Sequence, residues 1–273
     1  MQHEKNGIKY WTYGDKEKYP LFLVHGFTGS HEGFQYLIPE LEKHFFIIAP
    51  DLPGFGKSRH AKQPWTAEHL AQETNDFLDS LELMQKPYLI SHSMGGLIAA
   101  QMLTLNPELF HEKTIFISPV PNKISWKDAR KAGVLAGRLQ YAVGHHIPKI
   151  ATSRSISRVA TAAMLRTTDK HLRRKIYQHH FDNLNYISSS KYNERMHLDI
   201  TRQGVVDFKK YLADFEIFII TGSNDNVTPL KHEQVLAKEL NAKLYIIPGT
   251  GHLAHYEHPD VITREIITYL NSK

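Results

Sequence analysis

The stretch LISHSMGGL contains two serines, Ser91 and Ser93, where an apolar run gives way to a helical pattern. A sharp turn at such a place forces its middle residue into a strained backbone conformation, and the residues two before and two after it must be small. Ser91 and Gly95 meet that requirement around Ser93, although glycine is more usual than serine at the first position. We therefore predict that Ser93 is a nucleophile at a helix N-terminus and that the N–H of Met94 faces a developing oxyanion.

A second motif, HGFTG, begins at His25 and directly follows an apolar run. A backbone N–H from a loop in this place can complete an oxyanion hole beside the nucleophile. We assign this donor to Phe27, and we expect Gly26 to let the backbone come close. His25 is expected to support the loop through hydrogen bonds and to transfer no proton.

Two later loops offer the other groups that acyl transfer needs. The sequence TGSNDNVTP places Asp225 after one apolar run, and PGTGH places His252 after the next. Because the carboxyl ends of parallel strands share one edge of a sheet, Ser93, Asp225 and His252 are expected to meet there. A serine hydroxyl needs a neighbouring base at neutral pH, so we predict His252 as the base and Asp225 as the carboxylate that orients its imidazole.

The histidines at this C-terminal loop offer a second interpretation, a metal site made by His252, His255 and His258. On a helix, residues three and six positions apart drift around the surface, and no acid-rich cluster accompanies these three. We predict no metal and no cofactor.

Short apolar runs are expected to form the strands that carry these loops. Each is nearly unbroken and rich in branched or aromatic residues, as in strands buried on both faces of a parallel sheet. The runs are 21–24, 45–49, 88–90, 114–117, 215–220 and 244–247. Helical patterns lie between them: one starts after the predicted N-cap Thr66, one lies around 235–240, and one runs from Pro259 towards Leu270.

The middle of the chain follows a different pattern. Residues 122–200 contain no strand-like run of comparable quality and favour helices, for example over 154–164 and 170–180. Strands on both sides would leave one sheet interrupted by a helical insertion. We predict a core made of residues 1–121 and 201–273 and a helical cap made of residues 122–200.

Composition describes an ordinary globular protein, with 41% apolar and 22% charged residues. The chain has no cysteine, which excludes a disulfide framework and fits a reducing compartment. Its first residues lack a signal-peptide pattern, and no run approaches the roughly 18 apolar residues of a membrane span. We expect a soluble cytoplasmic protein; its oligomeric state stays open.

Charge is unevenly spread over a chain whose formal net charge is +5. Residues 121–200 hold 15 Lys and Arg against 5 Asp and Glu. This excess favours solvated helix faces; the alternative is a cationic surface for anionic substrates or for weak association with an anionic membrane surface. Nucleic acid is the least supported partner, because no motif for it accompanies the charge.

Taken together, these motifs make the sequence similar to the α/β-hydrolase superfamily. The resemblance runs over residues 10–121 and from 215 to the C-terminus. It includes three further motifs: the segment DLPGFGKS, the pattern GxxDxxxP at Gly222, Asp225 and Pro229, and His252 followed by Glu257. It implies a mostly parallel central sheet flanked by helices, with the cap inserted after the sixth strand. We interpret DLPGFGKS as structural turn chemistry at the sheet edge.

The resemblance also implies a reaction. The sharp turn between strand and helix that carries Ser93 corresponds to the nucleophile elbow of this superfamily. Serine at the elbow argues against the dehalogenases and epoxide hydrolases of the superfamily, which use aspartate there. We expect hydrolysis of small-molecule carboxylic esters with small to medium acyl chains through an acyl-enzyme. A carbon–carbon bond hydrolase, a lyase or cofactor-free synthase, and a ligand receptor that retains the triad stay open. Apolar residues expected to line the substrate pocket are Leu135, Leu139, Val143, Met164 and Leu165.

Overall fold

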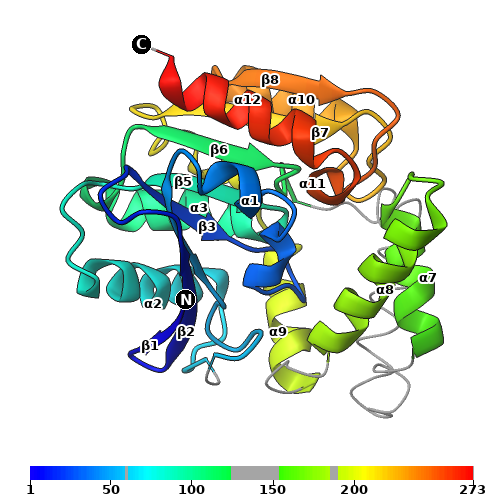
Figure 1. Cartoon of the computed structure of the whole chain (residues 1–273), viewed down its shortest axis with the longest axis horizontal. Coiled ribbons are helices and arrows are strands. Elements are labelled where there is room, and N and C mark those ends of the chain that lie inside the picture. The colour runs from blue at the N-terminus through cyan, green and yellow to red at the C-terminus, as the bar shows by residue number, and fades with distance from the viewer. Residues whose placement is uncertain (59–60, 124–153, 185–189, 273) are drawn as a thin grey trace.

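The computed structural model describes residues 1–58, 61–123, 154–184 and 190–272. Among these residues, eight strands form one sheet in the order β1-β2-β4-β3-β5-β6-β7-β8 (Figure 1). All neighbouring pairs from β4 to β8 are parallel, whereas β2 is antiparallel to both β1 and β4. The strands are β1 (Gln2–Lys5), β2 (Ile8–Tyr13), β3 (Pro20–Val24), β4 (Phe46–Pro50), β5 (Tyr88–His92), β6 (Lys113–Ile117), β7 (Glu216–Gly222) and β8 (Lys243–Ile247).

The six predicted apolar runs all form strands, β3 to β8, and the prediction of a mostly parallel sheet is confirmed. The prediction omitted β1 and β2. These two lie at the antiparallel edge of the sheet and are half-exposed or exposed over most of their length, with the sequence QHEK in β1. Strands that are exposed or half-buried, as β1 at the edge and β2 beside it are, carry no continuous apolar signal, so their sequences resemble loops.

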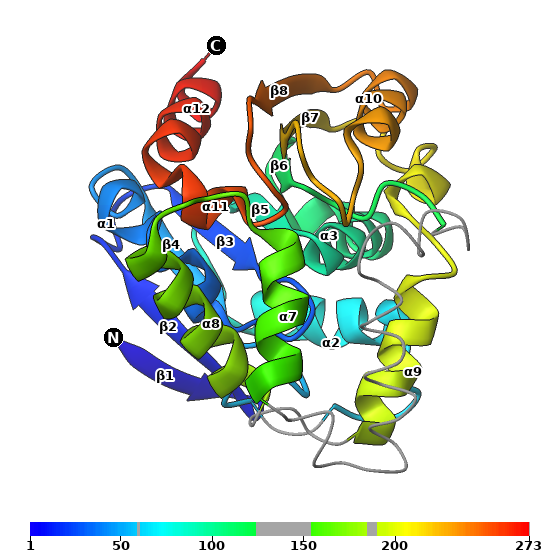
Figure 2. The same cartoon turned by 90° about the vertical axis from the view of Figure 1, so that its right-hand side faces the viewer.

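Helices cover both faces of the sheet. Helices α2, α3 and α10 lie on one face, and α1, α11 and α12 lie on the other (Figures 1 and 2). Alternation along β3 shows the division, because Phe22 and Val24 pack in the first layer while Leu21 and Leu23 pack in the second. The helices are α1 (Ile38–Leu41), α2 (Ala67–Ser80), α3 (Met94–Leu105), α10 (Leu230–Glu239), α11 (Ala254–Glu257) and α12 (Pro259–Asn271). Short 3-10 turns occupy η1 (His31–Phe34), η2 (Pro107–Leu109) and η3 (Val205–Phe208).

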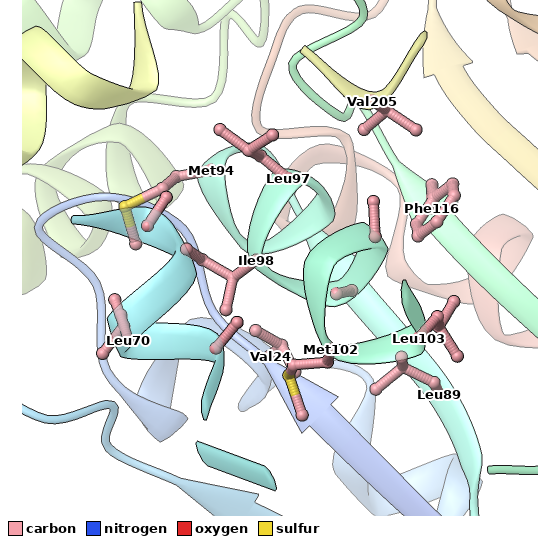
Figure 3. Close-up of a cluster of buried hydrophobic side chains, with 14 of the residues drawn as sticks. Val24, Leu70, Leu89, Met94, Leu97, Ile98, Met102, Leu103, Phe116 and Val205 are labelled. Atoms are coloured by element: carbon pink, nitrogen blue, oxygen red, sulfur yellow. The ribbon is translucent and has the colours of Figure 1, made fainter. Parts of the chain in front are cut away.

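Helix α3 is the best-packed element of the core. Every residue from Met94 to Leu103 is buried, because the helix lies between the sheet, α2 and η3. Figure 3 shows Ile98 on the side of α3 that faces Leu70 of α2 and Val24 of β3, with Leu97 on another side of the helix. The first turn of α3 is therefore held firmly on the sheet.

Three described helices lie in sequence between β6 and β7: α7 (Arg154–Met164), α8 (Lys170–Leu184) and α9 (Ser190–Ile200). They lie beside the sheet at the end toward which the arrowheads of β6 and β8 point (Figures 1 and 2). The predicted helix over 154–164 matches α7, and the one over 170–180 is the first part of α8; α9 was not predicted. The division into core and cap at residues 122 and 200 stays a prediction.

Hydrogen bonds join α9 to the rest of the structure. The Tyr192 hydroxyl donates to the carbonyl of Pro53 at 2.9 Å. Asp199 Oδ2 accepts a 2.7 Å bond from the N–H of Ala67, the first residue of α2, whose predicted N-cap Thr66 accepts from His69. A carboxylate at a helix N-terminus is favourable, so this contact stabilises α2 as well as the position of α9.

Candidate active site

Ser93 occupies the turn between β5 and α3 in a conformation that few residues adopt. Its φ is 55° and its ψ is −121°, outside the regions that side chains favour. The turn brings α3 so close to β3 that a Cβ at Gly95 would lie 2.3 Å from the carbonyl oxygen of Val24. Glycine is therefore required two residues after Ser93, as the elbow motif predicts.

Ser91 lies in β5, fully buried, two residues before the turn. Its hydroxyl makes only a long hydrogen bond, 3.5 Å, to the carbonyl of Ile115 on β6. A Cβ at Gly96 of α3 would be 3.7 Å from that hydroxyl, which is ordinary contact distance. Ser91 thus has space for a small side chain under α3 and faces away from solvent, so of the two serines only Ser93 is placed for chemistry.

The structure brings Ser93, His252 and Asp225 into one chain of hydrogen bonds. His252 Nε2 lies 2.8 Å from Ser93 Oγ, and His252 Nδ1 lies 2.8 Å from Asp225 Oδ2. The histidine is buried in the loop after β8, and the aspartate in the loop after β7. The arrangement places the Nδ1 proton toward the carboxylate and leaves Nε2 to accept the serine proton.

The carboxylate of Asp225 accepts four hydrogen bonds, three of them besides the one from the His252 ring. Its Oδ1 accepts from the backbone N–H of Val227 at 2.7 Å and of Thr228 at 2.9 Å, and its Oδ2 accepts from the Thr228 hydroxyl at 2.8 Å as well as from His252. Burial alone would raise the pKa of Asp225, but His252 and the Thr228 donors outweigh it and lower that pKa. The carboxylate stays ionised beside the imidazole.

The loop after β3 lies against the elbow. A Cβ at Gly26 would be 2.9 Å from His92 Nδ1 and 3.2 Å from the Cβ of Ser93, so only glycine permits this approach. Phe27 and Met94, the predicted oxyanion residues, line the same cavity as Ser93. Their role in stabilising an oxyanion stays a prediction.

His25 supports this loop with both ring nitrogens. Its Nε2 accepts a 2.9 Å bond from the N–H of Leu52, so the ring proton is on Nδ1, which donates to the carbonyl of Gly26 at 2.8 Å. Burial lowers the pKa of His25 to about 4. The ring is neutral and fully occupied by backbone partners, which suits a structural role better than proton transfer.

The segment DLPGFGKS is organised by Asp51, which is completely buried at the end of β4. Its carboxylate accepts from the N–H and Nδ1 of His31, at 2.8 and 2.7 Å, and from the N–H of Lys57 at 2.7 Å. Burial acts to raise the pKa of Asp51, yet the His31 contact holds it below its ordinary value. These contacts fit the interpretation of the segment as structural, because none of them involves Ser93 or its partners.

Two further side chains hold the histidine loop, and the sequence analysis assigned neither a role. The Nε2 of His92, next to the nucleophile, is 3.2 Å from the carbonyl of His252 and donates to it. Burial lowers the pKa of His92 well below its ordinary value, which keeps the ring neutral. Its place beside Ser93 in the elbow motif was the available signal.

Glu257 is the second such residue, and it connects the histidine loop to the end of α7. Its Oε2 accepts a 2.9 Å bond from Gly251 N–H, and its Oε1 accepts from the N–H groups of Arg166 and, at 2.9 Å, Thr167. The N–H of His252 in turn donates to the carbonyl of Met164 at 2.9 Å. The segment that follows α7 and the loop of His252 are therefore held as one unit.

A cavity of about 200 Å³ opens beside Ser93 and His252. The core side contributes Phe27, Met94 and Leu253, and helices α7, α8 and α9 contribute the facing wall. Of the residues predicted to line the pocket, Met164 does so, whereas Leu165 does not: it packs in a separate buried cluster with Ile176, Leu253 and Tyr256. The prediction for Leu165 is wrong because an apolar side chain near the end of a helix can point either into a cavity or into the packed interior, and the sequence does not distinguish the two. Leu135, Leu139 and Val143 lie outside the described residues.

Neither a metal site nor a membrane span is found in the parts of the chain that the structure describes. There, no group of three or more His, Asp or Glu side chains is arranged to hold a metal ion. His255 belongs to α11 and His258 precedes α12, so the three histidines of the C-terminal loop do not share one helix. Within the same ranges, no helix has the length and apolarity needed to cross a bilayer.

Comparison with known proteins also indicates an α/β hydrolase fold. The model of the family described as alpha/beta hydrolase fold matches residues 19–259. Esterase YbfF of Escherichia coli is 27% identical over 258 residues, which cover 92% of this chain and 93% of that protein. The 2-hydroxy-6-oxo-6-(2'-aminophenyl)hexa-2,4-dienoic acid hydrolase of Metapseudomonas resinovorans is 22% identical over 273 residues, 93% of this chain and 84% of that protein.

Solved structures show the same architecture. The esterase EaEST from Exiguobacterium antarcticum aligns with a TM-score of 0.80 at 18% identity, over 97% of this chain and 96% of its own, a likeness of fold. The family model spans all the strands from β3 to β8 and the three loops that carry Ser93, Asp225 and His252. This chain belongs to the α/β hydrolase fold family.

Proposed function

We propose that this protein is a serine hydrolase that cleaves carboxylic esters of small to medium acyl chains through an acyl-enzyme. The observation that carries the proposal is the pair of 2.8 Å contacts that join Ser93 Oγ, the His252 ring and Asp225. A relative named as an esterase, matched over nearly its whole length, supports ester hydrolysis. The cavity of about 200 Å³ supports a compact substrate, since it lies below the ~300–1,000 Å³ of typical ligand pockets.

The reaction follows from the placement of protons. Ser93 Oγ attacks the ester carbonyl carbon as its proton passes to His252 Nε2, and Asp225 stabilises the imidazolium that forms. The N–H groups of Phe27 and Met94 bind the tetrahedral oxyanion, a contribution of roughly 3–4 kcal/mol per donor. His252 then protonates the leaving alcohol. Water attacks the acyl-enzyme through the same base, and the acid leaves as the proton returns to Ser93.

Helices α7 to α9 act as a cap in this proposal. They supply the wall of the cavity that faces the nucleophile, and the bonds between His252, Met164 and Glu257 attach them to the catalytic loop. The substrate lies between the cap and the carboxyl ends of the strands.

A fluorophosphonate probe tests the nucleophile directly, because it reacts with an activated serine. Ser93→Ala is expected to abolish labelling and turnover of 4-nitrophenyl butyrate, and the matched control Ser91→Ala is expected to retain both. Labelling that survives in Ser93→Ala but not in Ser91→Ala would overturn the assignment.

A carbon–carbon bond hydrolase is the second candidate, because a relative with that kind of name, a hexadienoic acid hydrolase, matches most of this chain. The two reactions use different substrates on the same triad. Turnover of 4-nitrophenyl acetate and butyrate compared with that of a vinylogous diketone separates them. Faster cleavage of the diketone would replace the ester proposal.

A further inference from the structure

The cavity wall supplied by α7, α8 and α9 carries several polar side chains beside the apolar Ala160, Met164 and Ile200. Helix α8 contributes His179, His180 and Asn183, and α7 contributes Ser157. The first two pack against Tyr256, four residues after the catalytic histidine, with ring centroids 6.0 and 6.4 Å apart. This wall is therefore close to the reacting groups.

Asn183 is oriented by a relay that reaches the core. Glu32 Oε2 lies 3.2 Å from His179 Nδ1, and His179 Nε2 lies 3.1 Å from Asn183 Nδ2. A hydrogen bond from His179 lowers the pKa of Glu32, so the carboxylate is ionised and accepts the Nδ1 proton. Nε2 then accepts from the Asn183 amide, which fixes the amide in one orientation.

This orientation leaves polar atoms of Asn183 without a partner. The side chain is only 4% exposed and lines the cavity, yet its Oδ1 accepts no hydrogen bond from any described residue, and the second N–H of its Nδ2 donates none to a described residue, so this N–H is the donor available to an ether or carbonyl oxygen. His180 is comparable, because none of the described residues hydrogen-bonds to its ring. Burial lowers the pKa of His180 to about 3, so the neutral ring offers one donor and one acceptor.

The described lining of the cavity disfavours two classes of ligand, charged groups and purely alkyl groups. No Lys, Arg, Asp or Glu belongs to the described lining, whose titratable side chains are histidines and a tyrosine. A carboxylate or ammonium group would lose its hydration without a counter-ion, which is costly. A purely alkyl group would leave the amide of Asn183 and the ring of His180 unpaired, which is also unfavourable. An uncharged group with hydrogen-bonding atoms fits best.

We infer that the substrate is an ester with an uncharged oxygen function, such as an ether, hydroxyl or carbonyl, which His180 and Asn183 bind on the cap side of the cavity. The inference rests on the proposed ester hydrolysis and specifies its substrate class. His180 and Asn183 act as specificity residues, and Glu32 and His179 position the amide.

Isosteric substrates test this inference. On the acyl side, 4-nitrophenyl pentanoate is compared with the ethoxyacetate and the 3-methoxypropanoate, in which one methylene becomes an ether oxygen. On the alcohol side, butyl acetate is compared with 2-methoxyethyl acetate. For each pair, kcat/KM of the ether substrate is divided by kcat/KM of the alkyl substrate, and this ratio is the ether preference. The ether preference of the wild type is then divided by that of the variant, so that the intrinsic reactivities of the two substrates cancel.

His180→Phe and Asn183→Leu keep the size of the side chains and remove their hydrogen bonds. In at least one substrate pair, the ether preference is expected to fall roughly fivefold or more in both variants. The matched control is His171→Phe, which makes the same substitution at an exposed position of α8 outside the cavity, and it is expected to leave the ratio unchanged.

The outcomes separate this inference from the proposal on which it rests. Ester turnover that depends on Ser93, with ratios equal in wild type and both variants, overturns only the specificity inference. Faster wild-type turnover of monomethyl succinate than of the ether esters overturns it as well, because that acyl group is anionic. Absence of any turnover that depends on Ser93 overturns both. If a variant fails to fold, the wild-type enzyme still provides a test. Its ether-over-alkyl ratio of kcat/KM is compared with the ether-over-alkyl ratio of the rate constants for hydroxide-catalysed hydrolysis. An enzymatic ratio that does not exceed the hydroxide ratio contradicts the inference.

Discussion

The carboxylate of Glu257 accepts a 2.9 Å hydrogen bond from the backbone N–H of Gly251, the residue immediately before the catalytic histidine candidate His252. Its other oxygen accepts from the N–H groups of Arg166 and Thr167 at the end of α7. A Cβ at Gly251 would lie 2.4 Å from the carbonyl of Met164, so the two segments are in direct contact. One side chain thus sets the position of the histidine loop relative to the segment that follows α7.

Replacing Glu257 by glutamine is expected to lower kcat about tenfold and to lower the melting temperature. Both carboxylate oxygens accept from backbone N–H groups, so an amide must turn its own N–H₂ toward at least one of them in either orientation. The loss of a charge-assisted bond of about 1.5–3 kcal/mol would loosen the loop that holds His252. Steady-state kinetics with 4-nitrophenyl butyrate and thermal melting measure the two effects.

The matched control for this substitution is Glu239→Gln. Glu239 is exposed and pairs with Lys209 at the surface, so the change is expected to leave kcat and melting temperature as in the wild type. Equal kinetics for Glu257→Gln and Glu239→Gln would show that the loop does not depend on the carboxylate.

Asp225→Asn is expected to lower kcat by about four orders of magnitude while the protein stays folded. Val227 and Thr228 donate backbone N–H groups to Oδ1, so the asparagine carbonyl is held there and its N–H₂ faces His252. The imidazole would then carry its proton on Nε2 and could not accept the proton of Ser93. Single-turnover and steady-state rates measure the loss; a decrease of less than tenfold would show that the tautomer does not limit the reaction.

Stability is expected to fall as the pH is lowered from about 6.5 to about 4. Burial holds the pKa of His25 at about 4, below the 6.5 of an unfolded histidine, so the folded state binds fewer protons across this interval. His25 alone accounts for about 3 kcal/mol at the acid end, from 1.36 kcal/mol per pKa unit. Buried His92 and His255 have lowered pKa values and act in the same direction.

Urea midpoints measured between pH 8 and pH 4.5 in the Glu233→Gln variant give the slope, because the raised pKa of buried Glu233 acts in the opposite direction over this interval. Asp51 and Asp225 also have lowered pKa values, but these carboxyl groups lose their contribution below their ordinary value of 3.8, outside this interval. Exposed His171 provides the control, because His171→Asn is expected to leave the slope unchanged. A midpoint that stays constant or rises on acidification would contradict neutral buried histidines.

Glu233→Gln is expected to stabilise the protein above pH 7. The side chain is completely buried in α10, and burial, followed by the negative charge of Asp225, raises its pKa well above 4.5. A carboxyl whose folded pKa is raised stabilises the fold fully below 4.5 and loses that contribution as the pH rises through the folded value. Glutamine is neutral at every pH, so the gain over wild type in urea midpoint should grow with pH; a constant difference from pH 5 to pH 9 would contradict a protonated Glu233.

Short-range patterns in the sequence were sufficient to predict the strands and the chemical groups at their ends. The runs that became β3 to β7 are mostly buried on both faces and apolar without alternation, and the run in the half-buried edge strand β8 is apolar as well, so each could be found without its neighbours. The small residues around Ser93 are a requirement of one turn, and the structure shows that requirement in the 2.3 Å approach of Val24 to the position of a Cβ on Gly95. Strands β1 and β2 gave no such signal, because the edge strand β1 is mostly exposed and its neighbour β2 is only half-buried along most of its length.

Side-chain direction was not predictable in the cap segment. Leu165 and Met164 are adjacent in sequence and both apolar, yet only Met164 faces the cavity. His179 and His180 resembled the other histidines of a basic helix, and their importance comes from the facing surfaces of Glu32 and Tyr256, which belong to distant elements.

The sequence by itself determined the fold class, the order of serine, aspartate and histidine along the chain, and the turn that exposes Ser93, because each depends on residues a few positions apart. Only the tertiary structure decided that His252 meets Ser93 across 159 positions at 2.8 Å, since the sheet places β5 and β8 with β6 and β7 between them and the loops must bridge that distance. It also decided the polarity of the cavity. That property is set where α7, α8 and α9 pack over the strand ends, and no local pattern of residues encodes which side chains meet there.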